Sequence, residues 1–117
     1  MNTKAKIGFE GEKAAADYLV SKGFKILCRN FRHRRSEIDI ICTNEQLLVF
    51  VEVKTKSYTA FGEPEVAVDD KKAAKIMEGA EHYIQETDWK GDVRFDVIAL
   101  VKSKGEFTIE HFEDAFY

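Results

Sequence analysis

The sequence lacks any long hydrophobic run, and its 117 residues include only one proline and two cysteines. No apolar stretch approaches the roughly 18 residues of a membrane-spanning helix, and the first residues lack the apolar core of a secretory signal. Cys28 and Cys42 show no metal-type spacing, so we expect reduced, buried thiols and no disulfide framework. These absences exclude a membrane-spanning protein and a small secreted scaffold, and they favour a cytoplasmic protein.

A strong net charge is also absent. Lysine and arginine total 18 against 21 acidic residues, which gives a net charge of -3. The basic residues are nevertheless clustered, because the stretch RNFRHRR contains Arg29, Arg32, Arg34 and Arg35 and no acid. Such a cluster can bind phosphates in a protein that is acidic overall, or it can be a solvated turn. Charge alone leaves both interpretations open.

The hydrophobic pattern predicts seven elements within a single domain, residues 1–117. A helix is expected over about residues 8–22, with Gly23 at its C-terminal cap. The first three strands should form an antiparallel meander, followed by a loop that holds the only proline. This order predicts an α/β protein with a mixed sheet flanked by helices. The other expected elements are strands over residues 24–32, 37–43, 47–54, 93–101 and 105–112, and a helix from Asp69 or Asp70 to near Glu86.

Charged residues interrupt two of these strands. Residues two apart share a face of a strand, so Asp39 should point away from both Ile38 and Ile40. Glu52 and Lys54 share a face at the end of LLVFVEVK, the most apolar strand. Because a short turn makes the two strands hairpin neighbours, we expect the carboxylates of Asp39 and Glu52 to converge.

Two converging carboxylates repel each other unless a proton or a cation lies between them. Oxygen ligands suit a hard divalent cation such as Mg²⁺, which keeps positions open for water and a substrate phosphate. Lys54 would then orient the attacking water or stabilise charge on that phosphate. An ordinary cross-strand ion pair is the alternative, and periodicity does not decide between them.

The spacing of these residues resembles a known nuclease pattern. An acid in one strand and Glu-x-Lys in the next, here Asp39 and Glu52-Val53-Lys54, is similar to the PD-(D/E)xK motif. The wider set resembles the YraN-like family of predicted endonucleases, relatives of archaeal Holliday-junction resolvases. One departure is Ser36, where that family usually has glycine. The matching segments are GFEGEKAAADYLVSKGFKILCRNFR, EIDIIC, LVFVEVKTK, FGEPEVAV, the helix Lys71–Tyr83 and RFDVIAL.

The resemblance implies a restriction-endonuclease-like α-β-β-β-α-β core and a hydrolase that cleaves DNA phosphodiesters, branched or damaged DNA included. It implies that Glu12, on the first helix, joins Asp39 and Glu52 as a ligand of Mg²⁺ or Mn²⁺. Asp39, Glu52 and Lys54 would be the catalytic residues. The rival hypothesis is a non-catalytic nucleic-acid-binding or accessory protein that keeps the same fold.

The sequence also supports predictions about several residues outside the acidic site. Glu37 either supports or joins the metal ligands or pairs with Arg34 or Arg35, and we favour an arginine partner. His33 and His111 are isolated and do not suggest zinc. The aromatic C-terminal HFEDAFY should pack onto the sheet or onto a partner chain, and a homodimer is left open. The DNA-contacting residues are expected to be Arg29, Arg32, Arg34, Arg35, Lys56 and Lys71, although Lys71, Lys72 and Lys75 are alternatively a solvated helix face.

Overall fold

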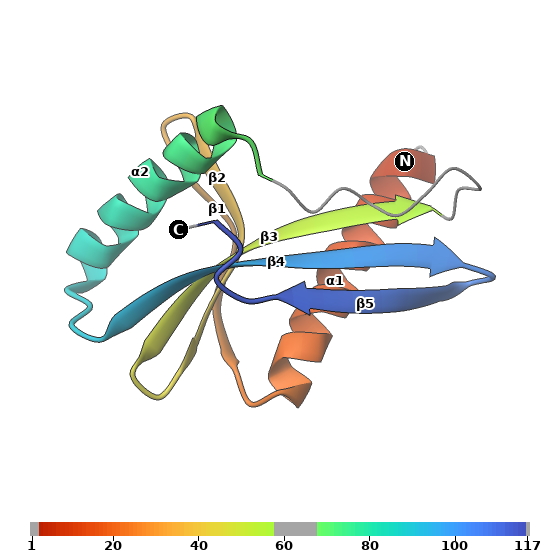
Figure 1. The fold of residues 1–117 in the computed structure, drawn as a ribbon, viewed down its shortest axis with the longest axis horizontal. Helices are drawn as coiled ribbons and strands as arrows, with labels where there is room; N and C mark the ends of the chain where they lie inside the picture. The colour runs from red at the N-terminus through yellow and green to blue at the C-terminus, as the bar shows by residue number, and fades with distance from the viewer. Residues whose placement is uncertain (1–2, 58–67, 117) are drawn as a thin grey trace.

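The computed structural model describes residues 3–57 and 68–116, and within them the chain forms two helices and five strands (Figure 1). The order and type of these elements are those expected, so the α/β class and the mixed sheet flanked by helices are confirmed. The elements are α1 (Thr3–Ser21), β1 (Lys25–His33), β2 (Ser36–Asn44), β3 (Leu47–Ser57), α2 (Asp70–Thr87), β4 (Asp92–Ser103) and β5 (Glu106–Phe112).

The ends of the helices follow local sequence signals. α2 begins after Asp69, whose side chain accepts the backbone N–H of Lys72, as expected of an N-cap. α1 is followed by Gly23 in the left-handed region, at φ 95°, and it begins five residues earlier than predicted. Lysine and alanine at positions 4–6 favour a helix even before the apolar stripe begins. The proline-containing loop lies outside the described residues, and neither described helix is long and apolar enough to cross a membrane.

The five strands form one sheet in the order β1-β2-β3-β4-β5. All neighbours are antiparallel except β3 and β4, which run parallel from the Leu47–Asp92 pair to the Ser57–Lys102 pair. The parallel pair is connected through α2, because two parallel neighbours need a long crossover. α1 packs on one face of the sheet and α2 on the other (Figure 1).

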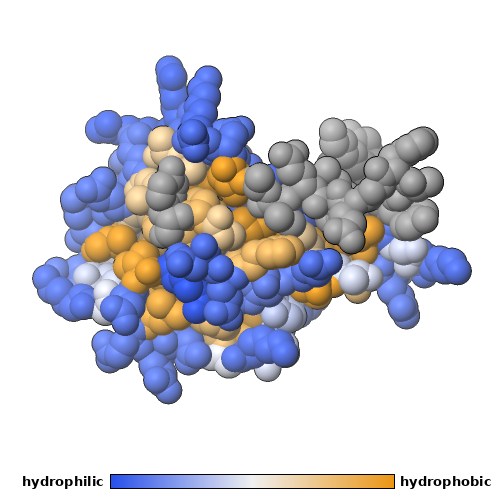
Figure 2. Space-filling model, in the orientation of Figure 1, coloured by the Kyte–Doolittle hydropathy of each residue, from blue (hydrophilic) through white to orange (hydrophobic). Residues whose placement is uncertain are grey.

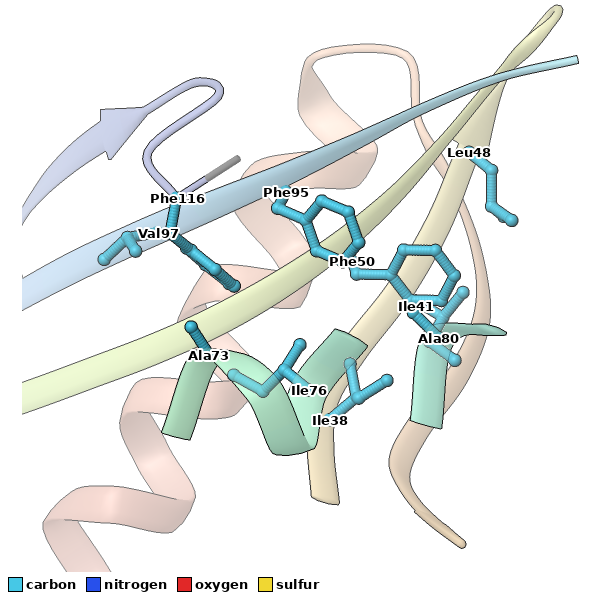
Figure 3. Close-up of a cluster of buried hydrophobic side chains, with 10 residues drawn as sticks. All are labelled: Ile38, Ile41, Leu48, Phe50, Ala73, Ile76, Ala80, Phe95, Val97 and Phe116. Atoms are coloured by element: carbon cyan, nitrogen blue, oxygen red, sulfur yellow. The ribbon is translucent and has the colours of Figure 1, made fainter. Parts of the chain in front are cut away.

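The α2 face of the sheet carries an aromatic core. Phe50 and Phe95 stack with their ring centroids 5.4 Å apart, and Phe116 packs against Phe95 (Figure 3). Ile76 and Ala80 extend from α2 into the same cluster. The aromatic C-terminal segment therefore packs on the sheet, one of its two expected places.

The α1 face carries an aliphatic core. Val49 and Val51 pack here with Leu19 of α1, so β3 alternates between faces as predicted. Ile40 also packs on this face, whereas Ile38 packs on the α2 face. The prediction that Ile38 and Ile40 share a face is therefore wrong.

The irregularity has a counterpart in the neighbouring strand. The register of β1 on β2 shifts between Ile26 and Cys28, and Asn30 adopts a left-handed conformation at φ 54°. Asparagine tolerates that conformation better than most residues do. The pleat is thus disturbed beside Asp39, and strict alternation does not describe this part of the sheet.

Hydrophobic side chains also reach the surface between α2 and the beginning of β4 (Figure 2). A groove of about 290 Å³ there is lined by Met77, Ala80, Ile84, Val93 and Phe95. Because Ala80, Ile84 and Phe95 belong to the aromatic core, the groove is the place where this core meets solvent.

Candidate functional site

The site lies where β2 and β3 separate. Their ladder ends at the Ile40–Val51 pair, although β3 continues beside β4 as far as Ser57. Beyond that pair, the backbone N–H of Val53 donates to Oδ2 of Asp39 at 2.8 Å. The Asp39 side chain therefore replaces a main-chain acceptor, and the opening between the strands holds a carboxylate. Glu52 and Lys54 lie beside this opening, within β3 rather than at its end as we expected.

The beginning of β2, which does not pair with β3, contacts α2. The hydroxyl of Ser36 is buried and donates to the backbone carbonyl of Lys75. Gly79 allows the approach, because a Cβ atom at this position would lie 2.8 Å from Cβ of Ser36. Ser36 thus supplies a contact that fixes this strand end.

A close approach of α1 places Glu12 near the same opening. A Cβ atom at Gly11 would lie 2.1 Å from Oγ1 of Thr55, so only glycine permits this distance between α1 and β3. The next residue, Glu12, has a buried Oε1 atom without a hydrogen-bond partner among the described residues. An unsatisfied buried carboxylate oxygen is unfavourable unless something else neutralises it.

The three acids act on one another electrostatically. Burial and the charges of Glu52 and Glu12 raise the pKa of Asp39 to about 7, although the Val53 N–H and Lys72 oppose the shift. Burial also raises the pKa of Glu12, and the charge of Glu52 adds to this effect. The charge of Glu52 thus disfavours ionisation of both Asp39 and Glu12, and the charge of Glu12 disfavours ionisation of Asp39.

Lys72 of α2 places a positive charge beside the acids. This contact was not predicted from the sequence. Lys72 forms an ion pair with Oε1 of Glu52, whose side chain is only 6% exposed. Burial acts to lower the pKa of Lys72, but the hydrogen bond and charge of Glu52 raise it above its ordinary value. Lys54 follows on the same strand face as Glu52, is half-buried and lies opposite Ala99 of β4.

Beside the acids lies a pocket of about 420 Å³, here called the basic pocket. It includes two of the residues expected at DNA, Arg35 and Lys71, and it shares Lys72 with the acids. The three lysines near the beginning of α2 therefore border a pocket rather than only a solvated helix face. Its lining consists of Arg35, Lys71, Lys72 and Lys75, together with Glu37, Asp69 and Ile76.

The remaining DNA-contact candidates are more dispersed. The charge of Arg29 opposes the rise in the pKa of Glu12, and Arg34 occupies the β1–β2 turn with φ 56°. Arg32 pairs with Glu37 at 3.5 Å. Glu37 thus has the arginine partner that we favoured, but the predicted identity, Arg34 or Arg35, is wrong because the β1–β2 register sets Arg32 opposite Glu37. The side chain of Lys56 lies outside the described part of the chain.

The donor chemistry of Glu12, Asp39 and Glu52 suits a hard divalent cation, and the unpartnered Oε1 of Glu12 provides a free oxygen. In residues 3–57 and 68–116, however, no three potential ligands are arranged tightly enough to hold a metal ion. The three carboxylates interact through charge, while Glu52 contacts Lys72.

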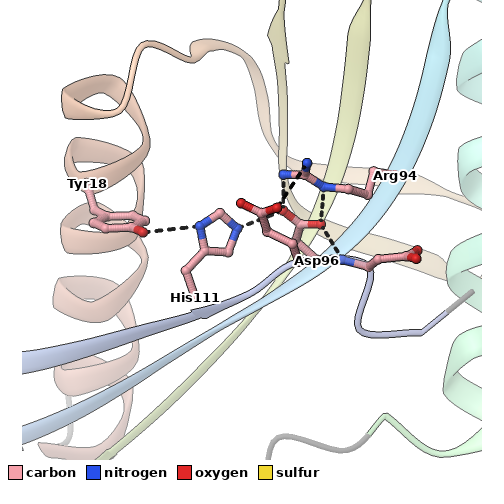
Figure 4. A network of polar contacts seen from close by, with 6 residues as sticks. Tyr18, Arg94, Asp96 and His111 are labelled. Carbon is pink, nitrogen blue, oxygen red and sulfur yellow. Dashed lines mark hydrogen bonds and ion pairs between the residues drawn. The ribbon is translucent and has the colours of Figure 1, made fainter.

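A second buried carboxylate, Asp96 of β4, was missed by the sequence analysis. It is fully buried and accepts two bonds from the Arg94 guanidinium, at 2.8 and 2.9 Å, and one from the backbone of Asp114 (Figure 4). His111 Nε2 lies 2.7 Å from Asp96, and its Nδ1 lies 3.2 Å from the Tyr18 hydroxyl. The prediction that His111 is isolated is therefore wrong. The signal was present, because Asp96 interrupts an apolar strand just as Asp39 does.

The chain is similar to a widespread group of bacterial proteins. The model of the Uncharacterised protein family UPF0102 matches residues 11–100. A UPF0102 protein of Phocaeicola vulgatus is 45% identical over 96% of this chain and 93% of its own length. A second, from Thermodesulfovibrio yellowstonii, is 44% identical over 97% of this chain and 98% of its own length.

Among solved structures, the chain is similar to SfsA of Pyrococcus furiosus, solved in complex with Ca²⁺. The TM-score is 0.40 at 17% sequence identity. The match covers 94% of this chain, which spans 63% of the SfsA chain.

Proposed function

This chain belongs to the family UPF0102, the YraN-like family expected from its motifs, and we propose that it is a divalent-metal-dependent DNA endonuclease of the PD-(D/E)xK type. The observation that carries the proposal is the environment of Asp39 and its effect on the pKa of this side chain. This carboxylate lies in a strand opening beside two other acids, and its pKa is raised to about 7. Such a site gains most from a bound cation.

Glu12, Asp39 and Glu52 would hold the cation, Mg²⁺ or Mn²⁺. When bound, the ion would supply Lewis-acid stabilisation of the scissile phosphate. The Val53 N–H fixes the orientation of Asp39, and the contact of Gly11 with β3 fixes the position of Glu12. The cation would thus hold the phosphate at the opening between β2 and β3.

Lys54 would complete the catalytic set. Its ammonium group extends from the same strand face as Glu52, so it can approach a phosphate held at the acids. There it would orient the attacking water and stabilise the negative charge that grows in the transition state. Lys54 should therefore act on the chemical step more than on binding.

The basic pocket and the arginines of residues 29–35 would hold the DNA backbone. Arg35, Lys71 and Lys75 converge on one pocket next to Glu52, through the shared residue Lys72. Phosphate contacts of this kind position DNA without reading its sequence. They would also serve a non-catalytic binding protein, which is the rival function.

A cleavage assay separates these functions. Purified protein is incubated with duplex, flap, single-stranded and four-way-junction DNA in Mg²⁺ or Mn²⁺. We expect cleavage of at least one substrate, its loss in Lys54→Ala and its retention in Lys22→Ala, an exposed lysine outside the site. Lys54→Ala should still bind DNA with only modestly lower affinity. Wild-type protein that binds DNA but cuts no substrate with either metal favours the non-catalytic function.

The binding half of the proposal has its own test. Each phosphate contact that is lost should reduce the slope of log affinity against log salt by about one. Arg32→Ala with Arg34→Ala should therefore weaken binding and flatten the slope by up to about two. The matched control, Lys90→Ala with Lys104→Ala, removes the same charge elsewhere and should leave the slope unchanged. Equal salt slopes in both double variants would show that Arg32 and Arg34 do not contact DNA.

A further inference from the structure

Lys72 is held at its main chain and is half-exposed along its side chain. Its backbone N–H donates to Oδ1 of Asp69 at 2.8 Å, so the first turn of α2 fixes its main chain. Its side chain extends to Glu52 and also lines the basic pocket. Lys72 therefore stands at the boundary between the acids and the pocket.

The two partners of this ion pair differ in their access to water. The Lys72 side chain is 50% exposed, whereas that of Glu52 is 6% exposed. An exposed ammonium group can return to solvent at little cost, but a buried ionised carboxylate needs a cation beside it. Glu52 thus needs a positive partner, but another cation can replace Lys72 in that role.

We propose that Lys72 is an exchangeable counter-ion, which neutralises Glu52 until a divalent cation takes its place. This inference rests on the proposed function, because it assumes that Glu52 is a cation ligand. The Glu52 carboxylate pairs with Lys72 in this structure, and it would instead hold the cation together with Asp39 and Glu12 once Lys72 is displaced.

The exchange explains why the three acids lie close together although their carboxylates are not arranged as metal ligands in this structure. An ammonium group and a divalent cation compete for the same buried carboxylate, and each excludes the other by charge repulsion. Once displaced, Lys72 remains in the basic pocket beside Arg35, Lys71 and Lys75. Cation binding would therefore free the charge of Lys72 from Glu52 and make it available to a phosphate in the pocket.

Binding of Mn²⁺ alone, without DNA, tests the exchange. Lys72→Met removes the competing ammonium group and keeps most of the side-chain volume, while Lys75→Met removes the same charge from the same pocket. We expect Lys72→Met to bind Mn²⁺ about fivefold more tightly than wild type, the size expected for an ion pair with one exposed partner. Lys75→Met should stay within about twofold of wild type. Lys72→Arg, which restores a cation, should return the affinity toward the wild-type value.

Equal Mn²⁺ affinity in Lys72→Met and wild type overturns the exchange and leaves the metal site standing. No Mn²⁺ binding by any variant overturns the metal site itself, and the exchange with it. Thermal unfolding with and without Mn²⁺ provides a second readout if Lys72→Met is less stable. A larger Mn²⁺-induced rise in Tm than in wild type is then the expected result, and an equal rise contradicts it.

Discussion

Asp39 and Asp96 are two carboxylates buried in the same sheet, and they differ in what surrounds them. Asp96 accepts hydrogen bonds from Arg94 and the Asp114 backbone and contacts His111. Burial acts to raise the pKa of Asp96, but these partners hold it below its ordinary value. Asp39 has one backbone donor and two acidic neighbours, and its pKa rises to about 7.

The difference shows that burial alone does not decide the state of a carboxylate. Asp96 is fully partnered, and its network joins α1, β4 and the C-terminal segment into one structure (Figure 4). At Asp39, burial and the charges of Glu52 and Glu12 outweigh the Val53 N–H and Lys72, so its ionised form is only partly compensated by the protein. We therefore regard Asp96 as structural, whereas Asp39 is the residue that our proposal assigns to a ligand of positive charge.

The largest expected effect concerns the partnered acid. Asp96→Asn should lower the free energy of unfolding by about 3 kcal/mol, because it leaves the Arg94 charge without its buried partner. Urea unfolding at pH 7 measures this loss. Asp92→Asn, exposed on the same strand, should change the free energy by less than about 0.5 kcal/mol. A loss at Asp96 no larger than at Asp92 would mean that the network contributes little.

The unpartnered acid should show the opposite sign. Asp39→Asn keeps an oxygen that can accept the Val53 N–H, and it removes the repulsion from Glu12 and Glu52. In the absence of divalent cations at pH 8, it should raise the free energy of unfolding by about 2 kcal/mol. A destabilised Asp39→Asn protein would contradict the assignment of Asp39 as an under-neutralised group.

The pH dependence sharpens the comparison. An acid whose pKa is raised on folding, from 3.8 to about 7 for Asp39, binds more protons in the folded state and loses stability as pH rises through that interval. The advantage of Asp39→Asn should therefore be near zero at pH 4, grow up to pH 7 and stay constant above it. Asp96 has a lowered pKa, so its contribution is present above about pH 4 and is lost below. Urea unfolding between pH 4 and 8 measures the Asp39→Asn advantage, and its extension below pH 4 measures the loss at Asp96. An Asp39→Asn advantage that is independent of pH fails this test.

The smallest expected effect lies at the outer end of the Asp96 network. Tyr18→Phe removes one hydroxyl, 3.2 Å from His111, and should lower the free energy of unfolding by about 1 kcal/mol. The loss should shrink in an Asp96→Asn background if the hydroxyl acts through the same network, as a double-mutant cycle would measure. Strictly additive losses would separate Tyr18 from Asp96.

Local signals in the sequence were sufficient to predict the elements. Alternating and helical hydrophobic patterns gave all seven in order, and Asp69 was recognisable as an N-cap because capping depends on residues three positions apart. The acids Asp39 and Glu52 were found because charged residues stand out in apolar strands. Glu12 came only from resemblance to a family, since a glutamate on a helix carries no such signal.

Features that depend on contacts between distant segments were not predictable. The different faces of Ile38 and Ile40 accompany a left-handed Asn30 between their β1 partners Arg29 and Phe31, and a hydrophobic pattern does not report such a conformation. The pairing of Lys72 with Glu52 depends on how α2 lies on the sheet. Asp96 was visible as an interruption of an apolar strand, but its partner His111 comes from a strand that pairs with β4 only in the folded chain.

The most direct test of the account is a calorimetric titration of Mn²⁺ into metal-free protein. Wild type should bind the cation, and the double variant Asp39→Asn, Glu52→Gln should bind it at least about tenfold more weakly, because affinity for a hard cation follows the charge of its oxygen ligands. The substitutions leave the Asp96 network untouched, so urea unfolding can verify that the fold is retained. Equal Mn²⁺ affinity in the two folded proteins would contradict the claim that Asp39 and Glu52 form a cation site.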